Sequence, residues 1–154
     1  MDYLTVKWLH VLSSTFLFGT GIGSAFYMLF TSLTRDARAT AVVVRHVVIA
    51  DWLFTTPAII VQPLTGFYLM HLAKIPFDSA WIIWSIVLYF VAGACWLPVV
   101  WMQIRMRTFA EEAARRDAPL PAVYWRYLKI WVALGIPAFF ALVIVFWLMV
   151  KKPF

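Results

Sequence analysis

The sequence predicts an all-α membrane protein, a bundle of four transmembrane helices. Hydrophobic residues make up 64% of its 154 residues and charged residues only 13%, against roughly 45–50% and 25% in soluble domains. Four stretches carry no Asp, Glu, Lys or Arg: 8–34, 52–73, 79–104 and 130–150, which are 27, 22, 26 and 21 residues long. A helix needs about 20 apolar residues to cross a bilayer, so each stretch is long enough to span it.

We therefore expect one integral membrane domain over 1–154, with spans at about 5–33, 41–73, 80–107 and 122–150. The first apolar run lacks a basic leader and is too long for the core of a cleaved signal peptide, so we interpret it as a span. The second span contains Pro57 and Pro63. Each proline removes a backbone donor, so we expect this helix to bend.

Basic residues are concentrated on one side of the predicted bundle. The connections after the first and third spans carry nine of the 13 Lys and Arg residues, whereas the side with both termini carries Lys7, Lys74, Lys151 and Lys152. Basic loops stay in the cytoplasm. We therefore expect a multi-pass protein of a bacterial inner membrane with both termini outside. The lipid bilayer is the expected partner, and no motif indicates nucleic acid.

Five ionisable side chains lie within or beside the spans: His10, Arg45, His46, Asp51 and His71. Such groups are expensive in hydrocarbon and are usually functional or paired. Arg45, His46 and Asp51 fall at the cytoplasmic end of the second span, where an interfacial cluster is the simpler interpretation. Asp51 is the member of this cluster whose charge would cost the most free energy in the membrane, and we expect it to have a cationic partner such as Arg45 or Arg105.

His10 and His71 form the most informative pair. The first lies near the start of span 5–33 and the second near the end of span 41–73, so antiparallel neighbours would hold both at a similar depth. Two imidazoles from facing helices are a common way to build a cofactor site in a bundle. Neutral imidazole binds haem iron, copper or zinc. A hydrogen-bonded interfacial histidine remains the alternative for each.

Haem fits this pair better than zinc does. Structural zinc prefers four ligands, whereas haem needs one or two axial ligands and an apolar slot, which aromatic residues such as Trp81 and Trp84 would line. Lys7 and Lys74 would meet the haem propionates at the surface. The predicted site therefore consists of His10 and His71 as iron ligands with these four residues around them. A copper site would instead use His10, Met70 and His71.

The stretch "FGTGIGSA" at 18–25 holds Gly19 and Gly23 at small-xxx-small spacing. In membranes such pairs allow helices to approach closely. We expect a packing role, which would also allow a homodimer. The sharper alternative is that these glycines leave room for a flat cofactor.

The first span, "YLTVKWLHVLSSTFLFGTGIGSAFYM", resembles the start of the HemJ-type protoporphyrinogen oxidases and, more loosely, of the CopD-like copper-resistance membrane proteins. The second span adds "DWLFTTPAIIVQPLTGFYLM", which is similar to the Thr-Thr-Pro segment of that family, and "SAWIIW" resembles the start of its third helix. The resemblance covers about the first 90 residues and is closest to the predicted integral membrane proteins grouped near HemJ.

The resemblance implies that His10 matches the haem-ligating histidine of HemJ proteins, which bind b-type haem and oxidise protoporphyrinogen. One feature departs from the pattern, because Trp84 and Ser85 lie where HemJ proteins carry a lysine. The expected function is therefore a haem b protein with an electron-transfer or oxidoreductase role, acting on a porphyrin, a quinone or a redox partner. The alternatives are a non-catalytic membrane subunit or assembly factor, and CopD-like copper handling.

Overall fold

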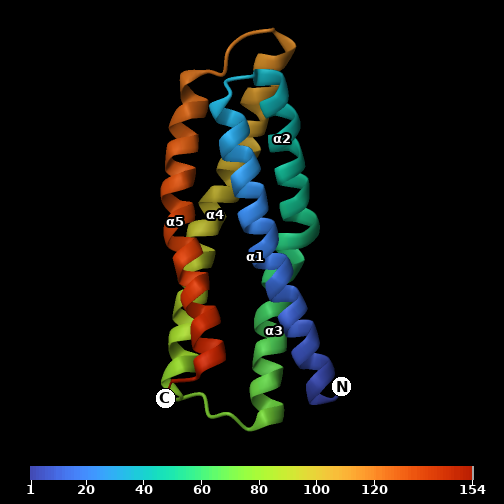
Figure 1. Ribbon diagram of the computed structural model, residues 1–154, viewed down its shortest axis with the longest axis vertical. Helices are drawn as coiled ribbons and strands as arrows, with labels where there is room; N and C mark the ends of the chain where they lie inside the picture. Colours follow the sequence, from blue (N-terminus) through green and yellow to red (C-terminus); the bar gives the residue numbers. More distant parts are fainter. Residues whose placement is uncertain (154) are drawn as a thin grey trace.

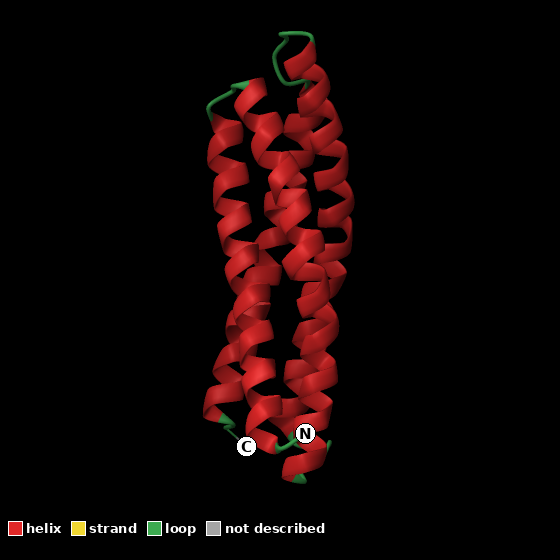
Figure 2. Ribbon diagram, turned by 90° about the vertical axis from the view of Figure 1, so that its right-hand side faces the viewer, coloured by secondary structure: helices red, strands yellow, loops and turns green. Residues whose placement is uncertain are grey.

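The computed structural model describes residues 1–153 and is an elongated helical bundle (Figure 1). Its helices are α1 (Tyr3–Leu33), α2 (Ala37–Ala50), α3 (Thr56–Ala73), α4 (Ala80–Arg115) and α5 (Ala122–Lys151), and a π-helical turn, η1 (Asp51–Thr55), joins α2 to α3. No strand occurs in the described residues (Figure 2). Because α2, η1 and α3 run on as one helix, four helices are long and apolar enough to cross a membrane. The predicted fold class is confirmed.

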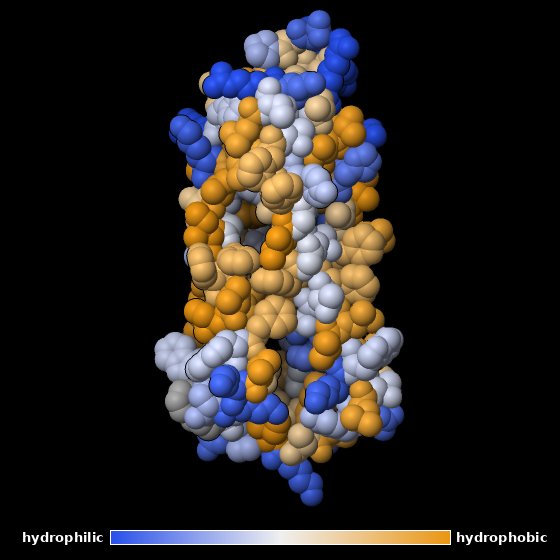
Figure 3. Space-filling model, viewed as in Figure 1, coloured by the Kyte–Doolittle hydropathy of each residue, from blue (hydrophilic) through white to orange (hydrophobic). Residues whose placement is uncertain are grey.

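The two ends of the bundle differ in what they carry. Both termini and the α3–α4 connection lie at one end, which we call the terminal end (Figure 1). The α1–α2 and α4–α5 connections lie at the other, which we call the basic end because the excess of Lys and Arg is found there. Hydrophilic residues gather at both ends, and an apolar band separates them (Figure 3). This distribution is what a bilayer-spanning bundle requires.

Side-chain caps begin the first two helices. Asp2 accepts a hydrogen bond from the Thr5 backbone N–H, and Asp36 accepts from the backbone of Arg38 and Ala39. These caps satisfy amide groups that have no partner within the first turn. The Asp36 cap also explains why the second span begins at Ala37, four residues before the predicted start near 41.

The closest helix pairs are α4 with α5, α2 with α4, and α1 with α3. The main core lies toward the basic end, where α1, α2, α4 and α5 bury residues including Met28, Val44, Met106 and Tyr124. A smaller core at the terminal end joins Met70 of α3 to α4 and α5. Large apolar residues are exposed along the outside of all helices, as expected where lipid rather than water is the solvent.

Two prolines change the backbone hydrogen bonding of the second span. Thr56 donates its backbone N–H to the Asp51 carbonyl across five residues, which is the π-helical spacing, and Pro57 follows directly. Pro63 lies inside α3 and has no N–H for the carbonyl of Ile59, four residues earlier. The Tyr89 hydroxyl of α4 donates to that carbonyl at 2.6 Å. A neighbouring helix thus satisfies the acceptor that the proline leaves free.

Candidate functional site

His10 lies between α1 and α3 in a compact cluster of polar side chains. Its Nδ1 is 2.8 Å from Thr65 Oγ1, and its Nε2 is 3.1 Å from Gln62 Nε2. Ser13, one turn along α1, hydrogen-bonds to Gln62 Oε1. The imidazole is half-buried, and both of its nitrogens are engaged by α3.

The hydrogen bonds in this cluster are consistent with a proton on Nδ1 of the ring. The Thr65 hydroxyl donates to the Val61 carbonyl at 2.7 Å, so its oxygen accepts the proton of His10 Nδ1. The Gln62 amide donates to Nε2, which therefore presents its lone pair. The Ser13 hydroxyl in turn donates to the Gln62 carbonyl oxygen. In this arrangement His10 is singly protonated and its Nε2 faces the Gln62 amide; the opposite tautomer, with that amide turned over and Ser13 donating to the His10 carbonyl, uses the same contacts.

Gly66 makes room for the imidazole. A Cβ atom built on Gly66 would lie 3.2 Å from His10 Cε1, closer than ordinary van der Waals contact. By contrast, a Cβ built on Gly19 or Gly23 would meet nothing within 4 Å. The close helix approach therefore occurs at Gly66, and no other part of the described chain packs against the predicted glycine pair.

The structure does not bring His10 and His71 together. His71 is exposed, in the last turn of α3. It follows Gln62 by nine residues, about two and a half turns, so it lies on the opposite side of α3 from the His10 cluster. Met70 is buried against Trp81 at the terminal end, and the three residues of the expected copper set are therefore not gathered in one place.

The remaining residues of the predicted site are spread over the terminal end. Lys7 is exposed and lies over the Tyr3 ring, whereas Lys74 is exposed at the left-handed end of α3. Trp81 is buried beneath Lys152, and Trp84 is 56% exposed on the outside of α4. No group of three or more His, Cys, Asp or Glu side chains meets within residues 1–153. The His10 cluster is thus the compact part of the predicted site.

A second polar region lies at the centre of the bundle. A cavity of about 580 Å³ is enclosed by α1, η1, α4 and α5, with one residue of α3, and Figure 3 shows the surface hollowed between α1 and α5. Its walls are apolar except for a few side chains, namely Asp51, Thr55, Tyr89, Trp96 and Trp131. The volume falls within the range of small-molecule sites, roughly 300–1,000 Å³.

Asp51 is the ionisable residue of this cavity. It is only 4% exposed. Its Oδ1 accepts a hydrogen bond from the Thr55 hydroxyl at 2.8 Å, whereas its Oδ2 has no partner within 3.5 Å, although the Gln103 side chain of α4 approaches the carboxyl group as a donor. Trp131, 7% exposed on α5, likewise has no partner for its indole N–H. Asp51 Oδ2 and Trp131 Nε1 both expose less than 1 Å², so they lie within the packed wall of the cavity and not on its surface.

The expected cationic partner of Asp51 is absent from the described residues. Arg45 and His46 are exposed, and the Arg105 guanidinium lies over the Phe109 ring. The ion pairs in residues 1–153 join Arg38 to Asp117 and Arg116 to Glu112, both at the basic end. The prediction failed because Asp51 continues the buried face of α2 formed by Val44, Val47 and Val48, whereas Arg45 and His46 are on its exposed side.

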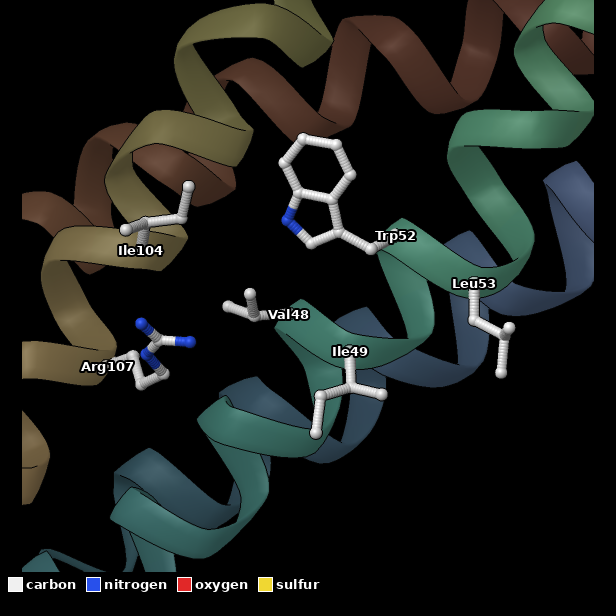
Figure 4. A pocket seen from close by; sticks show the side chains of 6 residues that line it. All are labelled: Val48, Ile49, Trp52, Leu53, Ile104 and Arg107. Carbon is white, nitrogen blue, oxygen red and sulfur yellow. The ribbon is translucent and has the colours of Figure 1, made fainter.

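A groove of about 400 Å³ lies on the outside of the bundle between α2 and α4. Figure 4 shows the Arg107 and Ile104 side chains of α4 across from Val48, with the Trp52 ring leaning over the gap. The guanidinium Nε of Arg107 is buried without a partner. One cation near the basic end with apolar walls is typical of an arginine that extends toward lipid head groups.

Sequence reasoning missed most partners of both regions. Ser13, Gln62 and Thr65 are uncharged, so a search for ionisable residues passes over them. A usable signal was present, because polar residues recur three apart on both helices, at 10 and 13 and at 62 and 65. Trp131 carried no such signal, since its importance depends on the cavity that it lines.

A family model described as "Predicted integral membrane protein (DUF2269)" matches residues 4–153. No curated protein and no solved structure matches the chain. The match covers nearly the whole chain, and the four apolar helices agree with its description. The chain belongs to the DUF2269 family of predicted integral membrane proteins.

Proposed function

We propose that this chain binds a b-type haem through His10 and has an electron-transfer or oxidoreductase role in the membrane. One observation carries the proposal. Both ring nitrogens of His10 contact uncharged side chains, Thr65 at Nδ1 and Gln62 at Nε2, an arrangement that accommodates a proton on Nδ1 and a lone pair on Nε2. Haem iron is bound by neutral imidazole in many membrane and soluble proteins, and this arrangement accommodates that form.

The residues around His10 fit one axial ligand. A metal-ligating histidine usually donates its other ring N–H to an oxygen, which fixes the ring orientation, and Thr65 supplies that oxygen. Gln62 is the group that iron would displace from Nε2. The carbonyl oxygen of its amide is held by a hydrogen bond from the Ser13 hydroxyl. Bound haem would supply one-electron chemistry. His71 faces away from this cluster, so the proposal depends on His10.

Apolar surface suited to a macrocycle lies on the same face of α1. Leu17 lines the central cavity, seven residues after His10, which is about two turns and about 10 Å along the helix. The resemblance to HemJ proteins supports haem for the same histidine. Ser85 donates to the Trp81 carbonyl, and Trp84 faces outward, so neither replaces the cation of those enzymes. We therefore favour electron transfer over protoporphyrinogen oxidation.

The proposed orientation places the basic end in the cytoplasm of a bacterium and the His10 cluster near the outer face of its inner membrane. The excess of Lys and Arg on the α1–α2 and α4–α5 connections supports it. A membrane-impermeant thiol reagent applied to intact cells should label Asp2→Cys at the terminal end and leave Arg115→Cys unlabelled. The reverse labelling would contradict this orientation.

The absorption spectrum of the protein purified in detergent tests the haem proposal. Expressed with ample haem, the wild-type chain should show a Soret band, and His10→Ala should lose it. His71→Ala is the matched control and should retain the band, because His71 is exposed and outside the cluster. A colourless wild-type protein, or equal loss of the band in both variants, would contradict the assignment of His10.

A further inference from the structure

We infer that the central cavity binds one anionic phospholipid, with an acyl chain between α1 and α5 and with the headgroup phosphate at Arg35 and Lys129. The space that the chain would fill runs from Phe18 toward the basic end. His10 lies eight residues before Phe18, about two turns toward the terminal end. The lipid site is therefore separate from the His10 cluster and does not depend on haem.

Side-chain contacts between α1 and α5 mark the two ends of this space, which we call the slot. Near the basic end, Ser32 Oγ is 2.6 Å from the Tyr124 hydroxyl oxygen. Toward the terminal end, the Phe18 ring stacks on Phe139, with ring centroids 5.5 Å apart. The two helices are not among the closely packed pairs, and the surface is hollowed between them (Figure 3). The cavity is therefore elongated along the helices.

The wall of the slot presents hydrocarbon. The Thr55 hydroxyl donates to Asp51 and the Tyr89 hydroxyl donates to the Ile59 carbonyl, so both hydroxyls are paired within the bundle. Asp51 Oδ2 and Trp131 Nε1 expose less than 1 Å². The other residues that line the cavity are aliphatic, aromatic or glycine. Cavities of this kind exclude water and take apolar guests, so the wall favours a hydrocarbon chain.

The slot is open to the bilayer. Several lining residues are also exposed on the outer surface of α1 and α5, namely Ile22, Phe26, Phe30, Ile136 and Phe140. A transmembrane helix is about 10–12 Å across with its side chains, which is too wide for an elongated cavity of about 580 Å³. An acyl chain is much thinner. We therefore favour a lipid over a helix of a second copy.

The slot has the depth of one leaflet. Lys129 directly precedes the charge-free stretch 130–150 of α5, so it marks the edge of the hydrocarbon layer at the basic end. Phe139, where the slot ends, follows Lys129 by ten residues, about 15 Å of helix. The hydrocarbon core of a bilayer is about 30 Å thick. The length of the slot therefore matches an acyl chain from one leaflet.

Two cations lie at this edge. Arg35 directly follows the charge-free stretch of α1, and its guanidinium lies over the Trp125 ring of α5, 5.8 Å from the centroid. One face of α5 carries, at spacings of three or four residues, Trp125, Lys129, Val132 and Ile136, and the last two line the cavity. Both cations are exposed, and neither forms an ion pair within residues 1–153. A phosphate at the head of the slot would meet both.

The charge of the site selects the headgroup. Two unpaired cations attract an anionic lipid, whereas they would repel the ammonium group of a zwitterionic one. Native mass spectrometry of the protein in detergent can compare phosphatidylglycerol with phosphatidylcholine of the same acyl chains, each titrated in turn. We expect one phosphatidylglycerol to bind at least fivefold more tightly. Equal affinities would overturn the inference.

Matched variants locate the site. Lys129→Gln should weaken phosphatidylglycerol binding about fivefold. Arg105→Gln is its control and should not change the affinity, although Arg105 borders the charge-free stretch of α4 in the same way. Gly135→Leu should weaken the binding of both lipids at least tenfold by filling the slot, whereas Gly19→Leu, outside the cavity, should not.

Three results with these variants would overturn the inference. The first is an equal loss of affinity in Lys129→Gln and Arg105→Gln, and the second is unchanged affinity in Gly135→Leu. The third is a dimer that holds no lipid and that Gly135→Leu abolishes, which would identify a second copy as the occupant. The comparison of the two lipids uses the wild-type chain, so it tests the inference even where a variant does not fold.

Discussion

The His10 cluster and the central cavity differ in how fully their buried polar atoms are hydrogen-bonded. Each places an ionisable side chain between helices of an apolar bundle. Around His10, Ser13, Gln62 and Thr65 engage both imidazole nitrogens. Around Asp51, one carboxylate oxygen has a partner and the other has none. The network around His10 joins two helices, and a ligand can reach an imidazole nitrogen only by displacing a side chain that already contacts it. The network around Asp51 leaves a buried oxygen without a hydrogen bond, which costs free energy of folding.

The largest effect on stability should come from closing the space that His10 occupies. Gly66→Leu forces a side chain into the imidazole, since even a Cβ would lie 3.2 Å from Cε1. Overpacking of this kind costs about 3 kcal/mol at its upper range. Thermal unfolding in detergent should show the loss, whereas Gly19→Leu should unfold close to wild type. Equal stability of the two variants would mean that α1 and α3 do not pack through Gly66.

The next largest effect on stability is expected from the hydrogen bond between the Tyr89 hydroxyl and the Ile59 carbonyl. Tyr89→Phe leaves the Ile59 carbonyl without the donor that replaces the missing N–H of Pro63. An unsatisfied buried acceptor should cost about 2 kcal/mol. Pro63→Ala restores the backbone donor, so the same Tyr89 change should cost much less in that background. A double-mutant cycle measures the coupling, and additive effects would disprove the link between these two residues.

A smaller effect, with the opposite sign, is expected at Asp51. Asp51→Asn removes a buried carboxyl group whose Oδ2 has no partner while keeping an oxygen for the Thr55 hydroxyl. We expect unfolding to become harder by about 1 kcal/mol. A large loss of stability in Asp51→Asn would show that the carboxylate has a structural partner.

The smallest effect lies outside both regions, at the first turn of α1. Hydrogen bonds from the Thr5 hydroxyl and backbone lower the pKa of Asp2 below its ordinary value of 3.8. The cap is therefore fully present above that value and is lost as the pH falls through the lower pKa of the folded state. Hydrogen exchange at the Thr5 amide should accelerate in that acidic range relative to the interior of α1. Unchanged protection there would contradict the cap.

The sequence predicted the fold more completely than the site. Charge-free stretches of spanning length determine the four helices, because backbone groups in a bilayer must be satisfied within each helix. The depth of His10 followed from the same reasoning. The partners of His10 could not be predicted in this way, because the choice between Gln62 and His71 depends on how α3 is rotated about its axis. The apolar residues of α3 are spread evenly around the helix, so the sequence does not indicate which face is buried. Asp51 continues the buried face of α2, three and four residues after the buried Val48 and Val47, whereas a charged residue at the end of a span was expected to lie at the interface.

The most direct test of the account follows the two imidazole nitrogens of His10 by ¹⁵N NMR. In the haem-free protein, we predict a proton on Nδ1 and none on Nε2, an arrangement that the hydrogen bonds with Thr65 and Gln62 accommodate. Addition of haem should shift or broaden the Nε2 resonance through the iron and leave Nδ1 protonated. A proton on Nε2, together with a spectrum that haem does not change, would contradict the assignment of His10 as a ligand.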